Sequence, residues 1–169
     1  HHAASSVEAY SQTLDWALRM VLLIAIPAAA ALMLLAEPIL ATLFLYGEVM
    51  TPRDMSMATL SLRAYSLGLV AFMLIKVLAP GFFARQDMRT PVRIGVIAMV
   101  SNMALNLILV IPLHFYWQVG HVGLALATSL SAFLNALLLF LALRSKAIYL
   151  PGTAWMHFMV TLLLAVTLM

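Results

Sequence analysis

The sequence predicts an all-α integral membrane protein. Hydrophobic residues make up 65% of the chain and charged residues 9%, and the mean hydropathy is +1.07. A soluble domain needs a more polar surface than this composition supplies. The apolar residues also gather in runs, most of them long enough to cross a hydrocarbon core of ~30 Å. We therefore expect about five transmembrane helices, the last of which is cut off at the end of the chain.

The first predicted helix covers about residues 15–36, and Pro27 in its middle predicts a kink. Glu37 and Pro38 then favour the start of a separate short helix, because an acid and a proline suit the first turn of a helix. This second segment, 38–46, is too short to span a membrane and is expected to lie along the interface.

The next predicted helix covers about residues 56–83 and carries two cations, Arg63 and Lys76. A cation near the centre of a bilayer costs roughly 2.5–3.5 kcal/mol on insertion scales, so each needs an explanation. Each side chain could extend to the nearer interface, or it could line a water-filled cavity that attracts an anion. The sequence leaves both alternatives open.

A basic connection, residues 84–93, follows this helix. Pro80, Gly81 and Pro91 are expected to break the helices on its two sides. Beside the single acid Asp87, arginines recur every four residues: Arg85, Arg89 and Arg93. These guanidinium groups could bind a substrate phosphate, and they could equally fix the topology and hold anionic headgroups.

Three further helices are expected at about residues 94–113, 122–143 and 154–169. Pro112 is expected to end the first of them, followed by an aromatic loop over 114–121. The helix at 122–143 carries a four-residue repeat that lets another helix approach closely: Gly123, Ala127, Ser131 and Asn135.

Asn102 and Asn106 lie four residues apart, so both amides share one face of their helix. The next helix, which runs antiparallel, carries Thr128, and the three side chains could converge. Amide and hydroxyl oxygens suit a hard monovalent cation such as sodium. Hydrogen bonding between helices is the alternative use of the same groups.

Covalent catalysis is not expected. The sequence contains no HExxH, GxSxG, GxxxxGK[ST] or GxGxxG motif. It contains no cysteine, which excludes a disulfide framework and a thiolate metal site. The bases do not cluster on a polar, aromatic-rich face as a nucleic-acid-binding protein requires. We expect neither an enzyme nor a nucleic-acid partner, and no cofactor apart from the sodium ion.

The distribution of lysine and arginine predicts the topology. Basic residues concentrate in the connections 84–93 and 144–152, together with Arg19 before the first apolar run, whereas the other connections contribute only Arg53. Basic loops remain on the cytoplasmic side. The N-terminal segment and these two loops are therefore expected to be cytoplasmic.

The segment Lys76–Arg93, which reads KVLAPGFFARQDMRTPVR, closely resembles the corresponding segment of the MurJ (MviN) lipid II flippases. Shorter matches are Leu14–Arg19, Ala64–Gly68 and Leu134–Asn135. The resemblance implies that residues 1–169 are a fragment of the C-terminal lobe of a fourteen-helix exporter-superfamily fold in the bacterial inner membrane. The last helix would then form one wall of a groove for the lipid tail.

That family moves lipid II, an undecaprenyl-diphosphate-linked precursor, across the membrane by alternating access. The partners implied are lipid II, membrane lipids and the remainder of the flippase, including its N-terminal lobe. Lys76 matches a family lysine, and with Arg85 and Arg89 it becomes a candidate for substrate binding. Some members hold sodium where Asn102, Asn106 and Thr128 fall, although Asn106 replaces an aspartate there. The alternatives are another exporter, such as a drug/cation antiporter or a polysaccharide-repeat flippase, and a membrane scaffold without transport.

Overall fold

The computed structural model is all helical, as predicted, and describes every residue except 1, 45–50, 118–119, 147–154 and 168–169. Five helices make up the described chain: α1 (His2–Phe44), α2 (Pro52–Phe83), α3 (Arg89–Trp117), α4 (Gly120–Ser145) and α5 (Trp155–Thr167). The first four are long and apolar enough to cross a membrane, and α5 is a shorter apolar helix.

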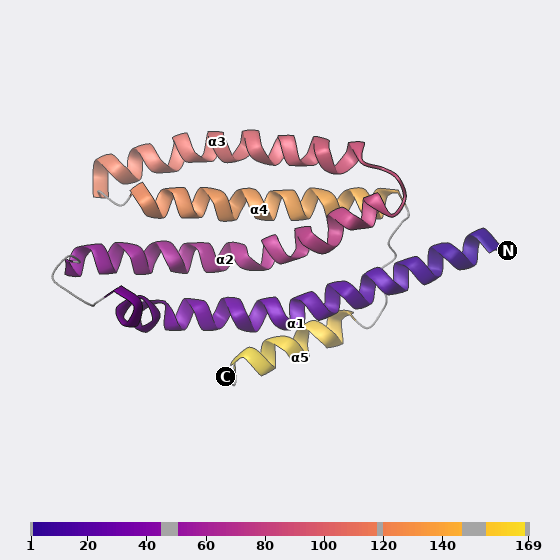
Figure 1. The fold of residues 1–169 in the computed structure, drawn as a ribbon, viewed down its shortest axis with the longest axis horizontal. Helices are drawn as coiled ribbons and strands as arrows, with labels where there is room; N and C mark the ends of the chain where they lie inside the picture. Colours follow the sequence, from indigo (N-terminus) through magenta and orange to yellow (C-terminus); the bar gives the residue numbers. More distant parts are fainter. Residues whose placement is uncertain (1, 45–50, 118–119, 147–154, 168–169) are drawn as a thin grey trace.

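The four long helices lie side by side in the order α3, α4, α2, α1, and α5 lies beside α1 (Figure 1). The extensive contacts are those of α2 with α4 and α1, and of α4 with α3, whereas α2 and α3 barely touch. Helices α2 and α4 are therefore the two inner helices of the layer. The carboxyl ends of α2 and α4 lie at the same end of the layer (Figure 1).

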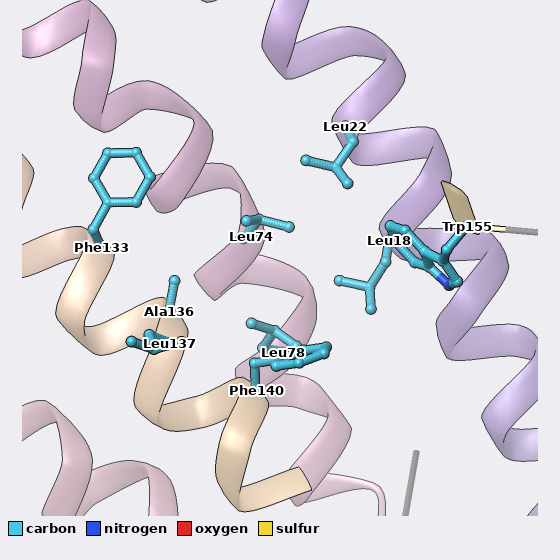
Figure 2. A pocket seen from close by; sticks show the side chains of 9 residues that line it. All are labelled: Leu18, Leu22, Leu74, Leu78, Phe133, Ala136, Leu137, Phe140 and Trp155. Carbon is cyan, nitrogen blue, oxygen red and sulfur yellow. The ribbon is translucent and has the colours of Figure 1, made fainter. Parts of the chain in front are cut away.

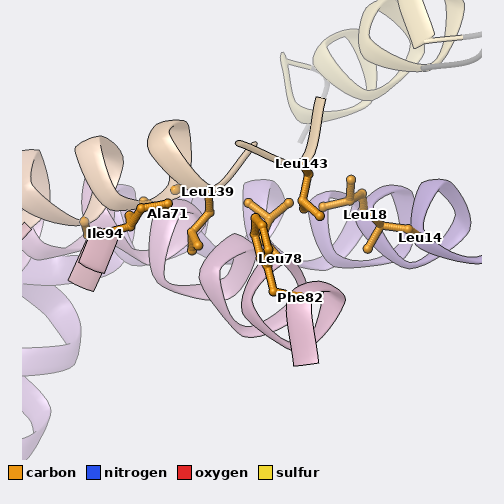
Figure 3. Close-up of a cluster of buried hydrophobic side chains, with 10 residues drawn as sticks. Leu14, Leu18, Ala71, Leu78, Phe82, Ile94, Leu139 and Leu143 are labelled. Atoms are coloured by element: carbon orange, nitrogen blue, oxygen red, sulfur yellow. The ribbon is translucent and has the colours of Figure 1, made fainter. Parts of the chain in front are cut away.

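The hydrophobic core lies near this end of the layer. Leucines of α1 meet large side chains of α2 and α4 there (Figure 3), and the large members with the least exposure are Leu18, Leu78, Phe82, Leu139 and Leu143. In a membrane these side chains stabilise the fold through close packing against one another rather than through removal from water.

Small residues bring the backbones of α2, α3 and α4 close together. The Ser129 hydroxyl donates to the Ala64 carbonyl at 2.7 Å, and the Ser131 hydroxyl donates to the Ala98 carbonyl at 2.7 Å. A Cβ added at Gly68 would lie 2.6 Å from Ser129 Oγ. Ser131 belongs to the predicted four-residue repeat, and a Cβ added at Gly123 of the same repeat would lie 3.1 Å from the Leu109 carbonyl of α3. The repeat therefore approaches α3 closely, whereas Ser129, outside the repeat, ties α4 to α2.

The predicted boundary at Glu37 and Pro38 is wrong, because α1 continues to Phe44 as one helix. A proline removes one N–H and bends a helix without necessarily ending it. The last turns of α1 indeed leave the line of the rest of the helix (Figure 1). The segment expected as a separate interfacial helix over 38–46 is therefore a bent extension of α1 as far as residue 44, and residues 45–46 lie outside the described residues.

Helix α1 also begins earlier than predicted, since residues 2–14 continue the helix ahead of the apolar run. Leu14 is buried, and the Tyr10 hydroxyl donates to the Gly81 carbonyl near the end of α2. These contacts with α2 stabilise the N-terminal turns of α1, whose polar sequence alone does not predict a helix.

Two other prolines fail to act as predicted. Pro112 lies inside α3, which runs on to Trp117, so most of the predicted loop 114–121 is helical and only 118–119 lie outside the described residues. Pro80 lies inside α2, although α2 does end at Phe83 as expected. In an apolar solvent, continuing the helix satisfies more backbone groups than ending it, so one lost hydrogen bond is tolerated. Pro91 lies in the first turn of α3, where no N–H is needed.

Candidate functional site

The basic connection between α2 and α3 is a tight, capped turn. Gln86 has a positive φ of 59°, which turns the chain after α2. Asp87 then caps α3, because its carboxylate accepts from the Thr90 backbone N–H at 3.1 Å and from the Thr90 hydroxyl at 2.8 Å. The sequence Asp-x-x-Thr at the start of a helix is a local signal for this cap.

Lys146, just after the end of α4, completes this cap. Its ammonium forms an ion pair with Asp87 and also donates to the Thr90 hydroxyl at 2.9 Å. The hydrogen bond from Lys146, followed by those from Thr90, lowers the pKa of Asp87 to about 2. The α2–α3 turn is thereby tied to the end of α4, 59 residues later in the chain.

The arginines of the connection keep their charge available. Arg85, Arg89 and Arg93 are exposed, and within the described part of the chain none of them pairs with a carboxylate. Arg85 lies over the Tyr10 ring, 5.8 Å from its centroid. Because Lys146 occupies the carboxylate of Asp87, the guanidinium groups can meet an external anion.

Lys76 lies apart from these arginines. It is exposed on α2 and makes no hydrogen bond or ion pair with the described residues. Nine residues separate it from Arg85 in the sequence, or roughly 13 Å along a helix. The structure therefore does not gather the predicted substrate-binding residues at one point, but places Lys76 deeper along the helix that ends at the basic turn.

A cleft of about 430 Å³ lies between α2, α3 and α4; this polar cleft is lined by two of the three predicted sodium-binding residues, and Asn106 is not among its lining residues. Asn102 and Thr128 line it together with Ser131 and Asn135. The Asn106 amide donates to Asn102 Oδ1 at 3.0 Å, so the amide–amide bond joins two residues of α3 rather than two helices. The Thr128 hydroxyl donates to the Leu124 carbonyl at 2.9 Å.

Two amide oxygens remain without a partner in the described part of the chain, one on Asn135 in the wall of the cleft and one on Asn106, four residues after Asn102. Asn106 Oδ1 and Asn135 Oδ1 are buried and have no hydrogen-bond partner in the described part of the chain. Unpaired buried oxygens are costly, and they suit a hard cation or a donor from a neighbouring helix. The donor set is neutral, since within the described residues no three His, Cys, Asp or Glu side chains cluster. Asn135 was expected only as a packing residue, although its four-residue spacing from Ser131 places it on this face.

An apolar groove of about 250 Å³ runs between α1, α2 and α4 (Figure 2). Its walls are Leu18 and Leu22 of α1, Leu74 and Leu78 of α2, and Phe133, Ala136, Leu137 and Phe140 of α4, with Trp155 of α5 at one side. Such a lining suits a hydrocarbon chain and offers nothing to a polar ligand.

Trp155 is held at this groove by polar contacts with α1. Its indole N–H donates to Asp15, which pairs with Arg19 at 2.7 Å. The Arg19 guanidinium lies over the Trp155 ring, 5.5 Å from its centroid. Since α5 otherwise touches α1 little, this cluster positions the start of α5.

The family model described as lipid II flippase MurJ matches residues 1–169. The chain is 52% identical to the probable lipid II flippase MurJ of Vibrio cholerae over 148 residues, covering 88% of this chain and 27% of that relative. It is 43% identical to the lipid II flippase MurJ of Burkholderia cenocepacia over 161 residues, covering 95% of this chain and 30% of that relative.

A solved structure of lipid II flippase MurJ in an inward closed conformation has the same fold, with a TM-score of 0.77 at 24% identity, over 95% of this chain and 32% of that one. The chain thus spans less than a third of the proteins that it matches. With four helices able to cross a membrane, it is a multi-pass membrane protein. The match over its whole length shows that the chain belongs to the MurJ family.

Proposed function

We propose that residues 1–169 form part of the C-terminal lobe of a flippase that moves lipid II across the bacterial inner membrane by alternating access. The observation that carries the proposal is the family match over the whole chain. Transport moves the substrate without breaking a covalent bond, so the polar side chains bind and release rather than catalyse.

The basic turn is proposed to attract the diphosphate of the substrate. Arg85 and Arg89 are exposed and unpaired within the described chain, and guanidinium groups bind phosphate oxygens in a bidentate manner. Lys76 would meet the diphosphate next, farther along α2, because a cation inside the membrane region attracts an anion from the interface. The connections 84–93 and 144–152 would lie on the cytoplasmic side.

The apolar groove is proposed to hold part of the polyprenyl tail. Its nine lining residues are all apolar side chains or the ring of Trp155, which suit a hydrocarbon chain rather than a charged headgroup. A groove beside the polar path lets the head and the tail of one lipid move in different surroundings.

A sodium ion is proposed at the polar cleft. Asn102, Asn106 and Thr128 would supply oxygens, and the unpaired Asn106 Oδ1 and Asn135 Oδ1 support the fit. An ion bound by neutral oxygens alone would be weakly held, and the remainder of the protein would complete its coordination.

The substrate role of Lys76 is tested by complementation of a flippase-depleted cell with full-length variants. Lys76→Arg keeps the charge and should retain growth, whereas Lys76→Gln should lose most of it at equal membrane abundance. Full growth of the Gln variant at wild-type abundance would eliminate the substrate role and leave Lys76 as an interfacial anchor. Arg144→Gln, an exposed arginine at the end of α4, serves as the control for loss of one positive charge.

A further inference from the structure

A second polar cavity, of about 570 Å³, lies between α1 and α2 and is lined by the first third of α2. Its lining ends at Arg63, some 20 residues before the basic turn. At about 1.5 Å per residue this is about 30 Å along α2, so the cavity lies far from the basic turn. None of the substrate-binding or sodium-binding residues considered above lines it.

Arg63 supplies the positive charge of this cavity. It lies eleven residues after Pro52, or about 16 Å along α2, and its Nε–H donates to the Met33 carbonyl of α1 at 3.3 Å. This bond holds the guanidinium group against α1, close to the bend at Pro38. In the described part of the chain the side chain has no carboxylate partner, so its charge is available to a ligand in the cavity.

Glu37 supplies a negative charge on the wall of the same cavity. Glu37 lies four residues after Met33, about 6 Å farther along α1 than the residue whose carbonyl holds Arg63. The two side chains do not pair with each other. Thr59, one helical turn before Arg63 on α2, is 5% exposed and its hydroxyl has no hydrogen-bond partner in the described part of the chain. The cavity therefore presents a negative charge from α1 and a positive charge from α2 that do not pair with each other, together with an unused hydroxyl.

We propose that this cavity binds a zwitterionic group, with an oxyanion at Arg63 and a primary ammonium at Glu37. A simple anion would be repelled by Glu37 and a simple cation by Arg63, whereas a zwitterion satisfies both charges and leaves its oxyanion near Thr59. A phosphoethanolamine headgroup has this chemistry, and so does an amino-acid end group with free ammonium and carboxylate. A phosphoglycerol headgroup lacks the ammonium and would leave Glu37 unpaired.

The test is ligand binding to the purified full-length protein in detergent, measured by native mass spectrometry. Phosphatidylethanolamine should bind at least about tenfold more tightly than phosphatidylglycerol of the same acyl chains, because a lost charge-assisted hydrogen bond costs about that factor. Glu37→Gln should abolish this preference, and Arg63→Gln should weaken binding of phosphatidylethanolamine at least about tenfold. Arg63→Lys, which keeps the charge, should retain the preference, and Arg144→Gln should change nothing.

Glycylglycine separates the two sources of the zwitterion. Displacement of phosphatidylethanolamine by millimolar glycylglycine supports an amino-acid occupant, and absence of displacement supports the lipid headgroup. Equal binding of the two phospholipids by the wild-type protein overturns the proposal. A preference for phosphatidylethanolamine that survives Glu37→Gln also overturns the proposal. So does an equal loss of thermal stability in Glu37→Gln and Arg63→Gln without any response to phosphatidylethanolamine, because that result would indicate a direct ion pair between the two residues.

Discussion

Asp87 is the one acid of the segment 84–93, and its carboxylate is fully used by Thr90 and Lys146. This division of charge leaves Arg85 and Arg89 for anions from outside the chain. The sequence shows the acid and the arginines but not which cation the acid selects, because Lys146 lies on another helix. That partner could be found only from the fold.

The cap predicts a specific dependence on pH. Because the pKa of Asp87 is lowered to about 2 from an ordinary value of 3.8, its contribution to stability is complete above about pH 4 and is lost as the pH falls toward 2. The melting temperature of Asp87→Asn should therefore lie below that of the wild type at pH 7, and the difference should shrink between pH 4 and 2. Lys146→Met should move this loss to higher pH. A difference that is constant from pH 7 to 2 would contradict the assignment.

Two substitutions at the predicted sodium site should change the sodium dependence of transport in opposite directions. Asn106→Asp adds a full negative charge beside an unpaired oxygen and should strengthen the dependence of transport on sodium, whereas Asn102→Leu should remove it. Transport by full-length variants is measured with sodium or potassium as the only monovalent cation. If both variants respond to sodium as the wild type does, the amides serve only to join side chains within the protein.

Among the helices, hydropathy predicted the positions of the long apolar segments correctly, whereas helix ends predicted from the positions of prolines were wrong. The expected helices at 56–83 and 122–143 correspond closely to α2 and α4. Pro38 and Pro112 were expected to interrupt the chain, yet both lie inside helices. The effect of a proline depends on how neighbouring helices support the bent segment, and Arg63 of α2, which donates to the Met33 carbonyl near the bend of α1, is such a neighbour. That neighbour is not visible in a single sequence.

The contact of α2 with α4 can be tested at its closest point. In Gly68→Ala the new Cβ would lie 2.6 Å from Ser129 Oγ and 3.0 Å from Ser129 Cα, so the backbones must separate. We expect a loss of about 1–3 kcal/mol of stability, as for other overpacked sites. Gly95→Ala is the matched control, because its Cβ would meet nothing within 4 Å, and it should be neutral or stabilising since alanine favours helix. Equal melting temperatures of the two variants would mean that α2 and α4 are less close than the structure shows.

At the scale of the whole molecule, the sequence predicted the class of fold and the candidate residues but not the helix order α3, α4, α2, α1. That order places Asn102 and Thr128 at one cleft and leaves Lys76 exposed on α2. It also brings together residues from different helices to form the apolar groove beside Trp155 and the cavity lined by Glu37 and Arg63. Periodicity within a helix shows which residues share a face, but not which helix covers that face.

The orientation of the helix layer in the membrane is a further prediction, and it can be tested by labelling the two ends of α4. His121 and Ser145 are exposed near its two ends, 24 residues or about 36 Å apart along the helix. Because the basic connections 84–93 and 144–152 favour the cytoplasm, cysteine at His121 should react with a membrane-impermeant thiol reagent in intact cells, and cysteine at Ser145 should react only after the membrane is opened. The full-length protein, with any other cysteines replaced, carries one of the two substitutions at a time, and complementation verifies that each variant still folds. Labelling of Ser145→Cys alone in intact cells would invert the layer and place Arg85 and Arg89 on the side away from the site of substrate entry.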